Sequence, residues 1–486
     1  MEKYHWIVTS SIFIADLAIR IGLSLRVIMR KRAASVTLAW LVIILLLPFV
    51  GAIIYLLLGE NRIGQKRAAH AARNLPLFKE WAAKLEERAQ VDWDTVNPEC
   101  RPIDKQANSI MGLPTVGGNE VTLLEDAENF FNSLIADIDR AKESCSLEFY
   151  IWHPGGRTEE VAASLVRAAS RGVKCKVLLD SIGSADFLKS SLAREMRSKG
   201  IEITEALPAG LFRALFVRID LRNHRKIVLI DNEIGYTGSQ NLVDPRYFKQ
   251  EEEVGQWIDT MVRLRGPVVE KMAATFLFDW FVENNISLDE MKEIGKIKPI
   301  PQAGDVPIQL VPSGPGFEED GIHDLLLTTI YAARKELVLT SPYFVPDNAI
   351  LSALKSAARR GVDVTIIVPR KNDSRLVHYA SRARYGQLAR SGVKIMPFQK
   401  GLLHAKTITV DRDFSLIGSV NLDMRSFWLN FELTLFVYNR RFTEQLRAVQ
   451  QTYIEGSQLL DSKHFDQRSF LLRLKENCAL IIGPLL

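Results

Sequence analysis

Two short segments of the chain, 180 residues apart, carry the same polar residues at the same spacing. Each reads His-x-Lys-x4-Asp and is followed by Gly-Ser-x-Asn. The first contains His224, Lys226, Asp231, Gly238, Ser239 and Asn241. The second contains His404, Lys406, Asp411, Gly418, Ser419 and Asn421. One copy is weak evidence in a chain of this size, but two copies matched through the serine and asparagine indicate a shared chemical role.

The residue types in each segment suit chemistry at a phosphate. A β-branched run predicts a strand, on which a His and a Lys two residues apart project to the same face. The serine and asparagine return to that face through the Gly-Ser turn. Two such sets facing each other would surround one phosphate with lysine and amide donors that stabilise developing charge. The two imidazoles can then divide the work of nucleophile and general acid.

Other interpretations of the two segments compete with this one. A lone histidine on a strand is more often a packed or surface residue than a catalyst, but no packing rule requires the same polar set twice. A metal site is the second alternative, because His and Asp are metal ligands. The lysine beside each histidine argues against it, since an ammonium group repels a cation. We therefore expect no metal and no other cofactor.

The doubled motif resembles the phospholipase D superfamily, whose members carry two such half-sites and work through a phosphohistidine. Over essentially its full length, the chain is further similar to the membrane-anchored bacterial cardiolipin synthases. Besides the N-terminal apolar region and the Pro484-Leu-Leu486 terminus, four segments carry this closer resemblance: Phe149–Gly156, Val243–Gln250, Ser313–Phe317 and Asn421–Ser426.

The resemblance implies an enzyme that transfers a phosphatidyl group between two phosphatidylglycerol molecules, giving cardiolipin and glycerol. It implies that His224 is the nucleophile and His404 the general acid. The groups expected to hold the phosphate are Lys226, Lys406, Ser239, Asn241, Ser419 and Asn421. It also implies that two carboxylates, Asp259 and Glu432, orient the catalytic imidazoles. Asp231 and Asp411 stand at an odd offset from their histidines, so we expect them on the opposite strand face in a structural role.

Three other activities use the same residues. A phospholipase D would use water as the acceptor, and a phosphatidylserine synthase would use another lipid pair. A superfamily nuclease needs a basic groove, whereas the net charge is only +5, from 62 Lys and Arg against 57 Asp and Glu. We therefore expect phosphatidylglycerol and a lipid bilayer, not nucleic acid, as partners, and the sequence leaves the oligomeric state open.

The first 60 residues predict a membrane anchor. The stretch Ala33–Gly59 holds no charged residue, and 27 helical residues at about 1.5 Å each exceed the roughly 30 Å of a bilayer core. We expect one transmembrane helix there, kinked at Pro48 and Gly51. The preceding stretch Trp6–Met29 contains Asp16 and Arg20, one helical turn apart and able to pair. It either spans the membrane as a second helix, which we favour, or lies in the interface. The expected location is the bacterial inner membrane.

Alternating helix and strand patterns beyond the anchor predict two α/β lobes with largely parallel sheets, related by a pseudo-twofold axis. The predicted divisions are a helical and linker region at 61–118, a first phospholipase D-like lobe at 119–294, a linker at 295–320, a second lobe at 321–460 and an interfacial C-terminal tail at 461–486. The four cysteines lie far apart, which predicts reduced thiols. A loop with apolar residues and arginines at Leu207–Arg218, and the tail segments Phe470–Leu474 and Ala479–Ile482, are expected to touch the bilayer surface.

Overall fold

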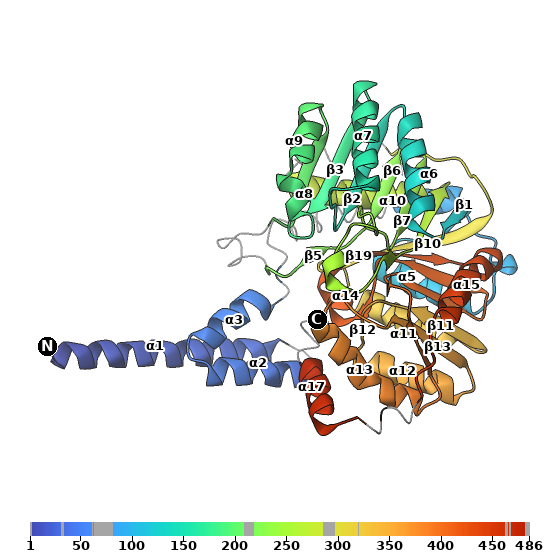
Figure 1. The fold of residues 1–486 in the computed structure, drawn as a ribbon. Coiled ribbons are helices and arrows are strands. Elements are labelled where there is room, and N and C mark those ends of the chain that lie inside the picture. The colour runs from blue at the N-terminus through green and yellow to red at the C-terminus, as the bar shows by residue number, and fades with distance from the viewer. Residues whose placement is uncertain are drawn as a thin grey trace. The chain divides into compact units, whose positions relative to one another are not determined.

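The structure is a computed structural model that describes residues 2–30, 34–60, 62, 81–208, 218–284, 297–318, 320–461, 465 and 468–481. The chain divides into two compact units. An N-terminal unit consists of Met1–Ala68 with Ala209–Leu221, and a catalytic unit consists of Ala69–Pro208 with Arg222–Leu486. Figure 1 shows the fold of each unit.

The described part of the N-terminal unit contains helices α1 (Glu2–Met29), α2 (Ala34–Leu46) and α3 (Val50–Leu58). The single kinked helix expected over residues 33–59 is therefore two helices, because helical structure ends at Leu46 and resumes at Val50. The interruption includes Pro48, one of the two positions where a kink was expected. Pro48 lies in the break and lacks the N–H that would continue the helix. Nowhere in the described chain does a helix combine the length and the apolar character needed to cross a membrane.

The predicted pairing of Asp16 with Arg20 is confirmed, and the pair stabilises this break. Asp16 Oδ1 accepts a hydrogen bond from the Phe49 N–H at 3.0 Å, and Arg20 Nη1 donates to the Leu45 carbonyl at 2.9 Å. These are main-chain groups that an interrupted helix leaves without partners. The two charges of α1 thus satisfy the end of α2 and the start of α3.

In the described residues the catalytic unit is built on one 15-stranded sheet, with fourteen strands in a continuous order and the short strand β5 (Arg222–Asn223) paired beside β19. From one edge, the strands of the first lobe are β4 (Glu202–Ala206), β3 (Lys174–Asp180), β2 (Ser144–Phe149), β6 (Ile227–Ile230), β7 (Ile234–Gly238), β9 (Met261–Arg265) and β1 (Val116–Leu124). The second lobe continues with β10 (Val306–Ser313), β19 (Asn430–Val437), β17 (Phe414–Gly418), β16 (Thr407–Val410), β11 (Glu336–Thr340), β13 (Asp363–Pro369) and β14 (Lys394–Phe398).

The two lobes meet where β1 pairs with β10 in antiparallel register, with Val116 opposite Ile308. From this pair outward, the strand order and directions of one lobe repeat those of the other. A pseudo-twofold axis through the β1–β10 pair produces this arrangement. The duplication seen in the sequence is therefore a duplication of the fold.

The sheet is mixed, so the expectation of largely parallel sheets holds only for the outer strands. Strands β2, β3 and β4 are parallel, as are β11, β13 and β14. Helices α7 (Arg157–Ser170) and α12 (Asn348–Arg359) supply the crossovers that parallel neighbours need. The inner strands, including β6, β7 and β9, pair antiparallel through shorter connections.

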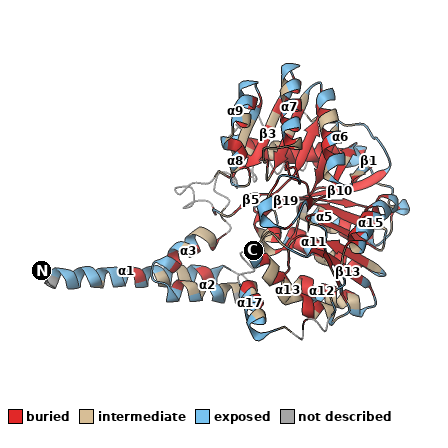
Figure 2. Ribbon diagram, in the orientation of Figure 1, coloured by how far each residue is buried: buried red, intermediate tan, exposed pale blue. Residues whose placement is uncertain are grey.

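Helices cover the sheet and bury it on both faces (Figure 2). In the first lobe they include α6 (Ala127–Arg140), α7, α9 (Ser191–Ser198) and α10 (Val268–Asn284). In the second they include α11 (Gly321–Ala332), α12, α13 (Arg375–Ala389) and α15 (Arg440–Glu455). The inner strands β6, β16, β10 and β19 are buried along their whole length.

The structure corrects two of the predicted divisions, and parts of two segments expected to touch the membrane lie outside the described residues. The expected linker at 295–320 contains the buried central strand β10. The helical and linker region expected at 61–118 contains helix α5 (Cys100–Met111) and also the start of strand β1. Pro102 sits in the first turn of α5, where proline is tolerated. Residues 209–217 of the expected membrane-touching loop, and residues 482–486 of the tail, lie outside the described residues.

Candidate active site

The segment before His224 leaves its own lobe and pairs with the other one. Strand β5 (Arg222–Asn223) lies parallel to β19 of the second lobe, and the His224 N–H donates to the Phe431 carbonyl at 2.9 Å. Phe431 directly precedes Glu432. The main chain therefore brings His224 beside a carboxylate that lies 208 residues away in the sequence.

The second half-site repeats this exchange in the opposite direction. Strand β15 (Leu402–Leu403) lies parallel to β8 (Trp257–Ile258) of the first lobe. The His404 N–H donates to the Ile258 carbonyl at 2.7 Å, and Asp259 is the next residue. Each lobe thus supplies one histidine and the carboxylate for the histidine of the other lobe.

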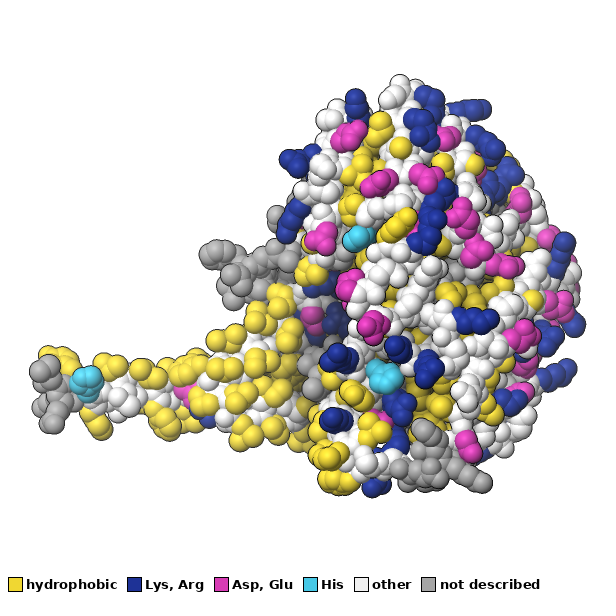
Figure 3. Space-filling view, in the orientation of Figure 1, with side chains coloured by type: hydrophobic (Ala, Val, Ile, Leu, Met, Phe, Trp, Pro, Cys, Tyr) yellow, Lys and Arg dark blue, Asp and Glu magenta, His cyan; other side chains and the backbone are white. Residues whose placement is uncertain are grey.

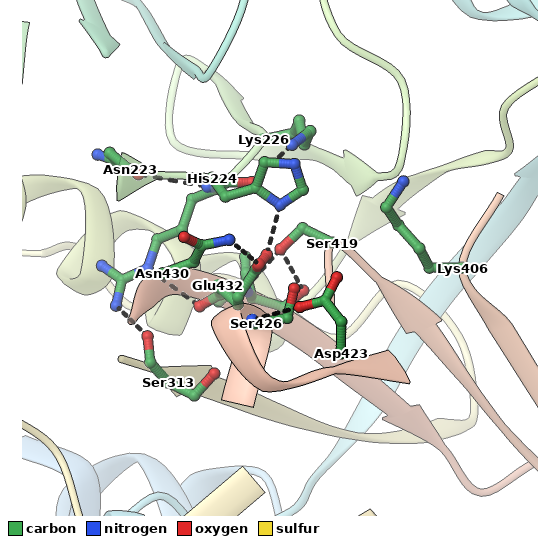
Figure 4. Close-up of polar contacts among 12 residues, drawn as sticks. Asn223, His224, Lys226, Ser313, Lys406, Ser419, Asp423, Ser426, Asn430 and Glu432 are labelled. Carbon is green, nitrogen blue, oxygen red and sulfur yellow. Dashed lines mark hydrogen bonds and ion pairs between the residues drawn. The ribbon is translucent and has the colours of Figure 1, made fainter. Parts of the chain in front are cut away.

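Both imidazoles bind these carboxylates through Nδ1. His224 Nδ1 lies 2.8 Å from Glu432 Oε2, and His404 Nδ1 lies 2.7 Å from Asp259 Oδ1. Figure 4 shows His224 standing over Glu432, with Lys226 and Lys406 flanking the imidazole. A carboxylate on Nδ1 fixes the ring and its tautomer and leaves Nε2 to react. Nothing in the sequence distinguishes this crossed pairing from a pairing within each lobe.

The two lysines have the same environment in both half-sites. Lys226 Nζ donates to the His224 carbonyl at 2.7 Å, and Lys406 Nζ donates to the His404 carbonyl at 2.6 Å. The strand expected to carry each His and Lys begins only after the lysine, at Ile227 in β6 and at Thr407 in β16. The two side chains still lie near each other, since each ammonium lowers the pKa of its own imidazole. Each lysine folds back onto the main chain of its own histidine.

Burial and mutual charge set the protonation of these four groups. Burial lowers the pKa of His224 and of His404 to about 4, and the ammonium groups of both lysines add to the lowering at each imidazole. Burial also lowers the pKa of Lys226 to about 7 and that of Lys406 to about 8. Because each histidine responds to the lysine of the other lobe, the four groups share one site. In that site both imidazoles are neutral at pH 7.

The motif serines contact the carboxylate-bearing strands rather than open space. Ser239 Oγ accepts the Thr260 N–H at 3.0 Å, and Ser419 Oγ accepts the Leu433 N–H at 2.9 Å. A side chain at the preceding glycine would collide with the carbonyl of Thr260 or of Leu433 in the respective lobe. The Gly-Ser pair therefore lets β7 and β17 approach the strands that position Asp259 and Glu432.

The motif asparagines keep polar atoms without partners. Asn241 Oδ1 accepts the Ile151 N–H at 3.2 Å, while its Nδ2 is buried with no hydrogen-bond partner. Asn421 has its unpaired buried atom at Oδ1. An unsatisfied buried amide costs free energy unless a ligand completes it. The unpaired Nδ2 is a donor and supports Asn241 as a phosphate-binding group, whereas the unpaired atom of Asn421 is an acceptor oxygen and gives no such support.

The motif aspartates lie at the far ends of β6 and β16. Asp231 accepts the N–H groups of three consecutive residues, Lys142, Glu143 and Ser144, at 2.7–3.2 Å. Asp411 does the same for Arg334, Lys335 and Glu336, at 2.7–2.8 Å. Each carboxylate fixes the start of the neighbouring strand, β2 or β11, in the structural role that the strand offset predicts.

Several residues around the site were not assigned a role from the sequence. Tyr150 stacks edge-on against His224 at 5.1 Å between ring centroids, and Trp257 lies 4.3 Å from His404. Asp423 is buried in strand β18 (Leu422–Asp423), and burial raises its pKa to about 7, with the charge of Glu432 adding to the rise. Tyr150 and Asp423 fall in segments that carry the family resemblance, which was the available signal for them, whereas Trp257 lies outside those segments.

A buried ionic network supports only the first half-site. Arg225, between the motif His and Lys, is fully buried, pairs with Asp279 and donates from Nε to the Glu432 carbonyl at 3.1 Å. Burial and the charge of Asp279 raise the pKa of the neighbouring Glu148. The equivalent of Arg225 in the second half-site is Ala405. The described residues contain no group of three or more His, Cys, Asp or Glu that could hold a metal ion.

A duplicated α/β fold with two exchanged His–carboxylate pairs and two lysines in one buried site defines a two-lobed enzyme of the phospholipase D class. Comparison with known proteins places the chain within that class. The family model "Cardiolipin synthase, PLD-like domain" matches residues 134–280 and 326–453. A model described as "Phospholipase_D-nuclease N-terminal" matches residues 18–60.

The chain is 44% identical to cardiolipin synthase A of Klebsiella pneumoniae over 486 residues, which cover all of both chains. It is also 44% identical to cardiolipin synthase A of Serratia proteamaculans over 96% of each chain. The chain therefore belongs to the cardiolipin synthase family. Among solved structures, phosphatidylserine synthase of Haemophilus influenzae shares the fold, with a TM-score of 0.58 at 14% identity over 80% of this chain and all of that one.

Proposed function

We propose that this protein is a phosphatidyltransferase that converts two molecules of phosphatidylglycerol into cardiolipin and glycerol. The observation that carries the proposal is the pair of buried imidazoles, each held at Nδ1 by a carboxylate from the other lobe. Two free Nε2 atoms and two lysines in one site are what a double displacement at phosphorus requires. Family membership and the relatives named cardiolipin synthase A support the choice of lipid.

In the first step, Nε2 of His224 attacks the phosphorus of one phosphatidylglycerol. The N–P bond forms and the bond to the head-group glycerol oxygen breaks, and His404 delivers a proton to that oxygen. The negative phosphodiester raises the pKa of His404 when it enters, since a nearby opposite charge favours the imidazolium form. Lys226 and Lys406 stabilise the charge that develops on the phosphoryl oxygens, and Asp259 stabilises the charged His404.

In the second step, a head-group hydroxyl of a second phosphatidylglycerol attacks the phosphatidyl-histidine. His404 now takes the proton of that hydroxyl, the new P–O bond forms and the N–P bond breaks. Cardiolipin leaves, and both imidazoles return to their starting state. The amides of Asn241 and Asn421 hold the phosphoryl group through both steps.

The test is product analysis of the purified full chain given labelled phosphatidylglycerol alone, with a chelator present. We expect cardiolipin and free glycerol in equal amounts. Phosphatidic acid in place of cardiolipin would show that water is the acceptor and would overturn the proposal. Turnover that begins only after phosphatidylethanolamine is added would overturn it in favour of another lipid pair.

We also propose that the N-terminal unit attaches the enzyme to the bilayer. Apolar side chains cover α1, α2 and α3 (Figure 3). Many are exposed, including Phe13, Ile14, Leu38, Leu46 and Ile53. The surface of a soluble protein rarely carries so large a continuous apolar area, and contact with lipid accounts for it. Bacterial inner-membrane location follows from this attachment and from the proposed lipid substrate.

Alkaline carbonate extraction of membranes that contain the full chain tests the attachment. The unchanged protein is expected to stay in the membrane pellet, and the variant Leu38→Arg/Val42→Arg to shift toward the supernatant. Both side chains are exposed, so the substitutions leave the packing of the unit intact. Ser198→Arg, at an exposed position of the catalytic unit, is the matched control. Release of the unchanged protein would refute the attachment.

A further inference from the structure

The catalytic unit ends in a helix whose outer face is apolar. In α17 (Phe470–Ile481) the side chains of Phe470, Leu471, Leu474 and Ile481 are between 48% and 79% exposed, and Cys478 between them is exposed as well. At about 100° per residue, these five positions fall within a sector of about 100°. They form one continuous strip, which we name the α17 strip.

The opposite face of α17 is fixed to the second lobe. Glu476 is 1% exposed and receives Arg382 Nε of α13 at 3.1 Å and a second ion pair from Arg468. Ala479 is buried in a cluster with Val345, Val377 and Ala380. An ion-pair clamp and an apolar contact thus set the orientation of the helix and direct the strip outward.

The charges around the α17 strip have one sign. Arg473 and Lys475 lie on either side of it and are exposed, and Arg375, also exposed, begins the helix α13 that packs against α17. The acidic residue of α17 is Glu476, which is buried and paired. An apolar strip flanked by Lys and Arg is the signature of a helix that lies in a membrane interface, and the cations favour anionic lipid head groups.

The α17 strip lies close to the reaction site. Its helix packs on Val345 of strand β12 (Phe344–Val345), which pairs in parallel register with β18, placing Val345 opposite Asp423. Asp423 borders Lys406 and Glu432 in the site (Figure 4). The buried face of α17 thus packs on the strand that pairs beside Asp423 of the site.

We infer that the α17 strip is an interfacial docking surface that binds anionic lipid bilayer and brings the second lobe onto the membrane, in addition to the N-terminal unit. The inference does not depend on the reaction proposed above. It concerns where the catalytic unit touches lipid, and a failure of either proposal leaves the other intact.

Cys478 is a suitable attachment site for a fluorescent probe of this contact. Of the four cysteines of the chain, Cys100, Cys145 and Cys175 are buried and Cys478 is exposed within the strip. An environment-sensitive fluorophore on Cys478 of the full chain, reconstituted in vesicles of phosphatidylglycerol and phosphatidylcholine, is expected to shift its emission to the blue. Lipids with a quencher near the head group are expected to quench it. The variant Leu471→Gln/Leu474→Gln, altered only at exposed positions, is expected to lose both effects.

Two controls make the measurement specific. In the variant Cys478→Ser/Ser198→Cys, the probe lies on α9 of the other lobe, at the end of the catalytic unit away from α17 (Figure 1), and is expected to stay unquenched by lipid. Arg473→Gln/Lys475→Gln is expected to reduce quenching more in vesicles rich in phosphatidylglycerol than in phosphatidylcholine alone.

Three results would overturn the inference. A Cys478 probe that remains open to aqueous iodide in vesicles would show that the strip does not meet lipid. Quenching that persists in Leu471→Gln/Leu474→Gln, or that is equal at residue 198, would show that the strip is not the contact. A blue shift in detergent that grows with protein concentration before lipid is added would assign the strip to a second copy of the chain.

Discussion

The two half-sites share one geometry but differ in what holds it. Each has a histidine bound to a carboxylate of the other lobe and a lysine bound to the main chain of its own histidine. Beneath the first lie the charged groups Arg225, Asp279 and Glu148, whereas beneath the second the neutral Gln450 bonds to Thr407 and Thr409.

This difference suggests how a duplicated site can serve an asymmetric reaction. The nucleophile and the general acid must both lie close to the phosphorus atom, and the shared geometry of the two half-sites places them there. The two histidines must also differ in how readily they gain a proton, and the different residues around them provide this difference. Arg225 donates to the carbonyl of Glu432, so it stabilises the strand that carries the partner of His224. Nothing similar supports Asp259 from position 405, which is alanine.

The largest expected effect on activity comes from replacing either motif histidine. His224→Ala and His404→Ala should each lower lipid turnover by roughly 10³-fold or more, since the two residues act in one double displacement. A phosphodiester with a nitrophenol leaving group needs no general acid. With it, His404→Ala should release a burst of about one nitrophenol per active site, and His224→Ala should release none. A burst in His224→Ala but not in His404→Ala would reverse the two roles.

The pairing of each histidine with the carboxylate of the other lobe can be tested in the His404→Ala variant, in which only the first half-site reacts. Glu432→Gln should then slow the nitrophenol burst by roughly 10²-fold or more, because His224 loses the carboxylate that fixes its tautomer. Asp259→Asn should have little effect there, since its partner is already absent. Stopped-flow measurement of the burst checks both variants. The opposite ranking would mean that each carboxylate serves the histidine of its own lobe.

The supporting networks should differ in their contribution to stability. Arg225→Met leaves Asp279 buried without its ion pair and should lower the free energy of unfolding by about 3–5 kcal/mol. Gln450→Met removes neutral hydrogen bonds from Thr407 and Thr409 and should cost about 1–3 kcal/mol. Thermal unfolding of the purified protein compares the two variants. Arg225→Met/Asp279→Asn, which removes both charges, should recover part of the loss. Equal shifts in the two single variants would contradict the asymmetry.

The pH dependence of kcat/KM should also distinguish the two lysines, with a smaller effect than the substitutions above. The pKa of Lys226 is lowered to about 7 and that of Lys406 to about 8. An amine loses its positive charge as the pH rises through its pKa, so kcat/KM should fall on the alkaline side from about pH 7. In Lys226→Gln the plateau should be lower and the remaining fall should move toward higher pH. An alkaline limb unchanged by this substitution would show that Lys226 does not control it.

The sequence predicted the duplicated fold and which side chains gather in the buried site, because the doubled motif places the same residues in each lobe. It could not predict the crossed pairing, since Asp259 is closer in sequence to His224, and Glu432 to His404, than to the histidine that each contacts. That pairing depends on β5 and β15 joining the opposite lobe, a long-range contact with no local signal. The serines were expected to bind the phosphate, and the sequence did not predict that they also accept N–H groups of Thr260 and Leu433 beside the two carboxylates.

Other differences have local physical causes. Apolar composition predicted one helix over residues 33–59, but Pro48 interrupts it, and Asp16 and Arg20 satisfy the ends that result. Proline and polar residues made residues 295–320 resemble a linker, although the interior of that stretch is a strand buried on both faces. A short, fully buried strand lacks the alternation that identifies strands in sequence.

The central claim is that a histidine of one lobe, held by a carboxylate of the other, carries the phosphatidyl group. Mass spectrometry of the full chain after a rapid denaturing quench, during turnover of labelled phosphatidylglycerol, tests it most directly. We expect label on the peptide that contains His224, and loss of that label in Glu432→Gln. Label on the His404 peptide, or turnover with no labelled histidine, would contradict it.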